Sequence, residues 1–211
     1  MALNWLAVCF NWKTANFLSK PAIILALLGW FFSTAGFSFP ALWFGIGLIF
    51  ALAGDTFLLF KGKSFMFGMA SFMLTHIFYS IGFNQSLLRL SPAIIALIVI
   101  IFSLWVWLFR ALRRRALSNP AYRKMEMPLI VYNLLILMMV ISALMTNFRA
   151  NWQPASAGLV SCGALLFLFS DVLLAFDRFI RPLPTARIWK RVTYQLGQLA
   201  IITGVLLTFS A

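Results

Sequence analysis

The chain has 211 residues, of which 63% are hydrophobic and 10% are charged, and its mean hydropathy is +0.97. Soluble globular proteins contain roughly 45–50% apolar and about 25% charged residues, so this composition excludes a water-soluble domain. The net charge of +13 suggests either nucleic acid or a membrane surface as a partner, and the positions of the basic residues decide between them.

Apolar stretches recur along the whole chain, and as helices they are long enough to cross a hydrocarbon layer of about 30 Å. Helices are the default form in a bilayer because they satisfy their own backbone polar groups. We therefore predict an all-α polytopic membrane protein that forms a single domain over residues 1–211, with about seven transmembrane helices. In chain order the predicted spans are residues 22–39, 41–60, 64–83, 92–109, 127–147, 155–176 and 192–210.

The segment before the first predicted span, residues 1–20, is too polar for a transmembrane helix of its own. We expect it to lie at the membrane interface, with Trp5 and Trp12 at the level of the lipid head groups. If this segment inserts instead, the protein has eight transmembrane helices.

The basic residues are distributed very unequally between the two sides of the predicted bundle. With the N-terminus inside, only Arg89 and Arg149 fall outside, which leaves 15 of the 17 Lys and Arg residues inside. The positive-inside rule accounts for this asymmetry, so nucleic acid is not expected as a partner. The short loops fit a bacterial inner (plasma) membrane with a cytoplasmic N-terminus.

The second and sixth predicted spans share a sequence pattern. The stretch GLIFALAGD at 47–55 parallels GALLFLFSD at 163–171, with the same separation between the glycine and the aspartate. This similarity predicts a 3+1+3 arrangement, in which two three-helix units in parallel orientation flank a linking fourth helix. Asp55 and Asp171 then lie at equivalent depths in the two units.

Asp55 and Asp171 are the strongest candidates for functional residues. A carboxylate inside a transmembrane helix costs about 2.5–3.5 kcal/mol on insertion scales, and such residues usually face the bundle interior. The alternative is that each aspartate only tethers neighbouring helices. Structural roles are expected for the other two acidic residues: Asp177 precedes Arg181 by four residues, and Glu126 begins a helix.

Further polar side chains occur within the predicted spans and could complete a cavity. They are His76, Tyr132, Tyr194 and Gln198. Each has a simpler interpretation as an interhelical hydrogen bond or an interfacial anchor. The single histidine cannot build a site with several imidazole ligands, so we expect no metal and no other cofactor.

Several short motifs together resemble the YhhN-type lysoplasmalogenase family. They are Lys20-Pro21, Ala53-Gly54-Asp55, His76 with Tyr79, Pro128 with Tyr132, the stretch from Phe169 to Ala175, and Tyr194 with Gln198. The similarity extends from residue 20 to the C-terminus. Members are usually described with eight spans, whereas the first is shortened or absent here.

The resemblance implies hydrolysis of the vinyl ether bond of lysoplasmalogen, a lysophospholipid of the membrane, to a fatty aldehyde and glycerophospho-ethanolamine or glycerophospho-choline. Cleavage of an enol ether needs an acid that protonates carbon and a base that orients water. We predict Asp55 and Asp171 as this catalytic pair. Substrate binding is predicted for Lys20, His76, Tyr132, Tyr194 and Gln198, with Lys20, Lys61 or the cytoplasmic arginines meeting the lipid phosphate.

Two other functions are compatible with the residues alone. A 3+1+3 repeat with intramembrane carboxylates also suits a small proton-coupled transporter. A membrane scaffold without catalytic activity would use the same aspartates only to hold helices together.

Overall fold

The computed structural model describes residues 13–60, 64–88 and 90–209 of the chain. All regular structure within these residues is helical, which confirms the predicted all-α class. The elements are α2 (Lys13–Ala35), α3 (Leu42–Phe57), α4 (Ser64–Phe83), α5 (Pro92–Ala116), α6 (Pro120–Lys124), α7 (Glu126–Met145), the 3₁₀ turn η1 (Thr146–Phe148), α8 (Pro154–Phe179) and α9 (Ala186–Phe209).

The protein is an integral membrane protein, and within its described residues five helices are long and apolar enough to cross a bilayer. These helices are α4, α5, α7 together with η1, α8 and α9. The apolar parts of α2 and α3 are shorter, at Lys20–Ala35 and Leu42–Phe57. Every predicted span coincides with a helix, but a count of seven crossings stays a prediction.

The ends of the helices have local causes. The first predicted span continues to residue 39, whereas α2 ends at Ala35 because Gly36 adopts a left-handed φ of 62° and its N–H donates to the carbonyl oxygen of Phe32 at 3.1 Å. The predicted interfacial segment 1–20 lies mostly outside the described residues, and with it Trp5 and Trp12. Helix α5 continues past its predicted end at 109, since the arginines that follow favour the helix and suit its C-terminal dipole.

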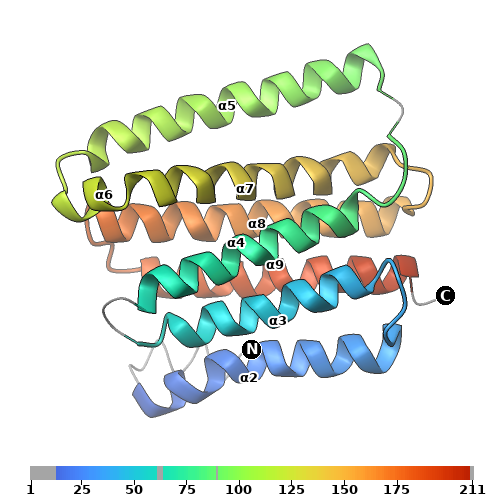
Figure 1. Cartoon of the computed structure of the whole chain (residues 1–211), viewed down its shortest axis with the longest axis horizontal. Coiled ribbons are helices and arrows are strands. Elements are labelled where there is room, and N and C mark those ends of the chain that lie inside the picture. The colour runs from blue at the N-terminus through green and yellow to red at the C-terminus, as the bar shows by residue number, and fades with distance from the viewer. Residues whose placement is uncertain (1–12, 61–63, 89, 210–211) are drawn as a thin grey trace.

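The helices lie side by side in one bundle, with α2 and α5 at opposite edges and α4, α8 and α9 between them (Figure 1). The described basic residues gather at the end of the bundle that carries α6, where α5 ends and α9 begins. Arg149, next to η1, is the exception at the other end in the described part of the chain. The bundle therefore has the charge asymmetry that the sequence predicts.

Two helix pairs make the most extensive contacts, α3 with α4 and α8 with α9. In both pairs the glycine of the shared sequence pattern lies at the contact: Gly47 faces Tyr79 of α4, and Gly163 faces Gly197 of α9. A Cβ added to Gly163 would lie 2.7 Å from the backbone oxygen of Gly197, so only glycine permits this approach. The internal repeat itself stays a prediction.

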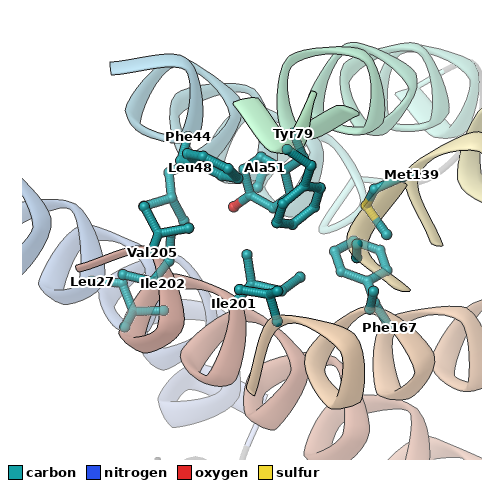
Figure 2. Packing of buried hydrophobic residues seen from close by; sticks show 14 of the residues in the cluster. Leu27, Phe44, Leu48, Ala51, Tyr79, Met139, Phe167, Ile201, Ile202 and Val205 are labelled. Carbon is teal, nitrogen blue, oxygen red and sulfur yellow. The ribbon is translucent and has the colours of Figure 1, made fainter. Parts of the chain in front are cut away.

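The main core fills the space between these two pairs. In Figure 2, Phe44 and Leu48 of α3 face the side of α9 on which Ile202 and Val205 lie. These four side chains are fully shielded from the surroundings. The core therefore holds α3 and α9 at a fixed separation, which positions the polar residues nearer the α6 end.

Helix α5 is packed quite differently from the others. Among its described residues only Ile94 and Ala116, near its two ends, are buried. Its middle exposes large apolar side chains, including Leu104 at 61% and Trp107 at 69%. These side chains would face lipid, and α5 rests mainly on α7.

Candidate active site

A cavity of about 570 Å³ lies at the basic end of the bundle. Its wall is built from residues of α2, the end of α3, α4, α7, the end of α8 and the start of α9. Five of the seven predicted site residues line it: Lys20, Asp55, Tyr132, Asp171 and Tyr194. Residues as far apart in sequence as Lys20 and Tyr194 thus meet around one space, which we call the polar cavity.

Asp55 forms an ion pair with Lys20. The Lys20 Nζ lies 2.8 Å from Asp55 Oδ1, across the contact between α2 and α3. Asp55 is 1% exposed, and its Oδ2 has no hydrogen-bond partner among the described residues. One carboxylate oxygen therefore remains for a water molecule or a substrate group.

The position of Asp55 follows from the close contact between α3 and α4. Gly54 packs against the ring of Phe72, where an added Cβ would come within 2.8 Å of the ring. This contact turns the neighbouring Asp55 towards the polar cavity, since consecutive residues of a helix point about 100° apart.

Asp171 has a different environment. The Tyr132 hydroxyl donates a hydrogen bond of 2.5 Å to Asp171 Oδ2, and His76 Nε2 lies 4.0 Å from the same oxygen. The Asp171 side chain is 15% exposed, whereas His76 is completely buried. Asp55 therefore faces an ammonium group, and Asp171 faces a phenol and an imidazole.

The other two predicted site residues, His76 and Gln198, lie behind the wall of the cavity. Tyr79 donates a hydrogen bond of 2.7 Å to Gln198 Oε1, and both residues are completely buried. Tyr194 lies close enough to Asp55 and Tyr79 to interact electrostatically with both. His76 and Gln198 do not line the polar cavity, so in this structure they border the cavity-lining residues instead.

Four basic residues of the cavity wall were not singled out individually from the sequence. They are Arg178, Arg187, Lys190 and Arg191. The guanidinium of Arg178 lies 3.6 Å from the ring centroid of Phe65, another wall residue. A helical signal was present, because Arg187, Arg191, Tyr194 and Gln198 recur on one face of α9.

The other two acidic residues have structural partners. Asp177 pairs with Lys190 at 2.6 Å and accepts a hydrogen bond of 2.9 Å from the backbone N–H of Leu183. The expected pairing with Arg181 is wrong for the described structure, because the turn after α8 brings α9 over Asp177. Glu126 pairs with Arg113 of α5, with 2.5 Å between Arg113 Nη2 and Glu126 Oε1.

Within the described ranges no three His, Cys, Asp or Glu side chains come together in a way that could hold a metal ion. The Nδ1 of His76 instead lies 3.3 Å from the sulfur of Met139. The polar cavity presents two carboxyl groups, two phenols and several cations.

Residues 15–205 match the model of the YhhN family. The chain belongs to the YhhN family. It is 29% identical over 197 residues to lysoplasmalogenase TMEM86B of Mus musculus, covering 93% of this chain and 76% of the mouse protein. It is 31% identical to lysoplasmalogenase TMEM86B of Rattus norvegicus, covering 93% of this chain and 74% of the rat protein. No solved structure matches the chain.

Proposed function

We propose that this protein is a membrane-embedded lysoplasmalogenase. It cleaves the vinyl ether bond of a lysoplasmalogen and releases a fatty aldehyde and glycerophospho-ethanolamine or glycerophospho-choline. The observation that carries the proposal is the polar cavity, where Asp55 and Asp171 from two different helices line one space beside several cations. The names of the relatives support the same reaction.

The different environments of the two aspartates support different roles for them. The ammonium of Lys20 favours the ionised form of Asp55. Asp171 receives a hydrogen bond from Tyr132 on Oδ2, so its Oδ1 is the oxygen that carries a proton to the substrate. Asp171 is therefore the general acid, and Asp55 is the carboxylate that stabilises positive charge and orients water.

The reaction begins when Asp171 gives its proton to the outer alkene carbon, which forms a C–H bond and leaves an oxocarbenium ion. Ionised Asp55 lines the same cavity and stabilises the positive charge of the oxocarbenium ion. Water then adds to the oxocarbenium carbon and gives up a proton to a carboxylate, forming a hemiacetal. The hemiacetal collapses when its hydroxyl loses a proton and the glycerol oxygen gains one, which releases the aldehyde and restores the acid.

The cations of the cavity wall suit the phosphate of the substrate. Arg178, Arg187 and Arg191 line the cavity beside the two aspartates. Guanidinium groups bind phosphate oxygens through charge-assisted, often bidentate hydrogen bonds. We propose that this cluster holds the head group at the cytoplasmic surface of a bacterial inner membrane, which also places the N-terminus in the cytoplasm.

The proposal is tested by measuring aldehyde release from a lysoplasmalogen by detergent-purified protein. Loss of a positioned acid or base typically lowers a rate by about 10²–10⁴, so we expect Asp55→Asn and Asp171→Asn each to lose activity by about that factor. Asp177→Asn is the matched control, because Asp177 lies on α8 like Asp171 but does not line the polar cavity. Its activity should stay near that of the wild type.

Gel filtration and thermal unfolding in detergent must show that each variant is folded. Aldehyde release that survives in the folded double variant of Asp55 and Asp171 would overturn the proposal. Solute flux into vesicles with no chemical change in the solute would instead support the transporter.

A further inference from the structure

A second cavity, largely apolar, lies beside the polar cavity. It is enclosed by α4, α5, α7 and α8, and we call it the apolar slot. Side chains that line it but not the polar cavity include Met69, Phe109, Leu112, Leu129, Ala175 and Phe179. Its volume of about 80 Å³ is much smaller than the 570 Å³ of the polar cavity.

The slot and the polar cavity share part of their walls. The shared residues are Leu58, Phe65, Phe72, Tyr132, Asp171 and Leu174. Tyr132 and Asp171, the hydrogen-bonded pair, are thus the polar groups at the junction of a charged space and an apolar one. A ligand that lies across the junction must have an anionic end and an apolar end.

A lysophospholipid has this shape, with one phosphate head group and one aliphatic chain. We propose that the apolar slot holds the aliphatic chain of the substrate, which places the bond between chain and glycerol at Asp171. This inference rests on the proposed function and extends it, because the slot defines how the substrate is oriented. Burial of each methylene group that enters the slot contributes to binding.

The chain reaches the slot from the bilayer, past α5. Phe109, Leu112 and Ala116 of α5 form the outer wall of the slot. Between its buried ends α5 makes few contacts, and apolar helices in lipid gain little from packing on one another because lipid tails are equally apolar. Entry past α5 therefore requires the Phe109–Ala116 end of this helix to move outward, against the ion pair of Arg113 with Glu126.

Filling the slot tests the proposal. Ala175→Phe adds a ring to the slot wall without changing the polar cavity, which Ala175 does not line. We expect kcat/KM for a long-chain lysoplasmalogen to fall by about tenfold or more, as the loss of a few buried methylene contacts implies. A short-chain vinyl ether with the same head group should be cleaved at the wild-type rate.

Ala155→Phe is the matched control, since Ala155 lies on the same helix at an exposed position outside both cavities. The Ala155→Phe variant should cleave the long-chain and the short-chain substrate with the kcat/KM of the wild type. An equal loss for the long and the short chain in folded Ala175→Phe protein would overturn the assignment, as would no loss for either.

A second measurement does not depend on hydrolysis. A saturated ether lysophospholipid with a photoreactive diazirine near the end of its chain is bound to the full-length protein and irradiated, and the labelled peptides are identified by mass spectrometry. Label on the α5 and α8 segments of the slot that disappears in Ala175→Phe supports the chain site even if the wild type releases no aldehyde. Label spread over the outer surface and unchanged in Ala175→Phe overturns it, even if aldehyde is released.

Discussion

At the scale of single residues, the two intramembrane aspartates differ in what faces them. Asp55 is held by an ammonium group at 2.8 Å, and Asp171 by a phenol at 2.5 Å. A pair of carboxyl groups whose surroundings differ in this way can divide the roles of acid and base. Two predictions follow from the partners, Lys20 and Tyr132, rather than from the aspartates themselves.

Tyr132 acts as a positioning residue for Asp171. Tyr132→Phe removes the hydrogen bond to Oδ2 but keeps the carboxyl group of Asp171 itself. We expect kcat to fall by about tenfold, which corresponds to the free energy of one strong hydrogen bond. The pH profile of kcat should also change, because Asp171 loses the hydroxyl group that contacts its carboxyl group. A profile identical to that of the wild type would mean that Tyr132 has only a structural role.

Lys20 stabilises the fold by compensating the charge of Asp55. Lys20→Met leaves a carboxylate that is 1% exposed without its cation, which typically costs about 3–5 kcal/mol. We therefore expect a clear loss of thermal stability in detergent. Adding Asp55→Asn to Lys20→Met should restore much of that stability, whereas additive losses in the double variant would contradict a direct pair.

At the scale of the helices, glycine contacts set the spacing of the pairs that carry the aspartates. Gly163→Ala places a Cβ 2.7 Å from the backbone oxygen of Gly197 and should lower the unfolding temperature by forcing α8 and α9 apart. Gly158→Ala on the same helix meets nothing within 4 Å, so it should be neutral or slightly stabilising. Equal behaviour of the two variants would argue against close packing at Gly163.

The sequence was informative about helices because hydrophobic length is the dominant signal in a bilayer. The third predicted span, 64–83, coincides with α4 at both ends. The first was too long because the backbone conformation at Gly36 is not encoded in hydropathy. The weak packing of α5 was also not predicted, since its sequence is as apolar as that of the buried helices.

The site was predictable in its acidic residues and less so in their partners. Asp55 and Asp171 stand out in sequence because carboxylates are rare in apolar helices, and the structure brings both to one cavity. The contact between Lys20 and Asp55 joins residues 35 positions apart on different helices, so local spacing gives no sign of it. Arg187 and Arg191 could not be distinguished in the sequence from the other basic residues, because the positive-inside rule already explains all of them.

At the scale of the whole molecule, charge asymmetry predicts the orientation in the membrane. The basic end, with α6, should face the cytoplasm. After replacement of Cys9 and Cys162 by serine, Ser118→Cys should react with an impermeant maleimide only from the cytoplasmic side, and Gln153→Cys only from the opposite side. Both positions are exposed and lie in turns at opposite ends of the bundle. The reverse pattern of labelling would contradict the proposed orientation.

In the proposed mechanism, a carboxyl group of the cavity protonates the vinyl ether carbon. The most direct measurement is mass spectrometry of the aldehyde released from a lysoplasmalogen in D₂O. We predict that the wild type releases aldehyde with one deuterium on the carbon next to the carbonyl, and that folded Asp171→Asn protein releases almost none. Aldehyde without that deuterium, or deuterated aldehyde formed equally fast by Asp171→Asn, would contradict the account.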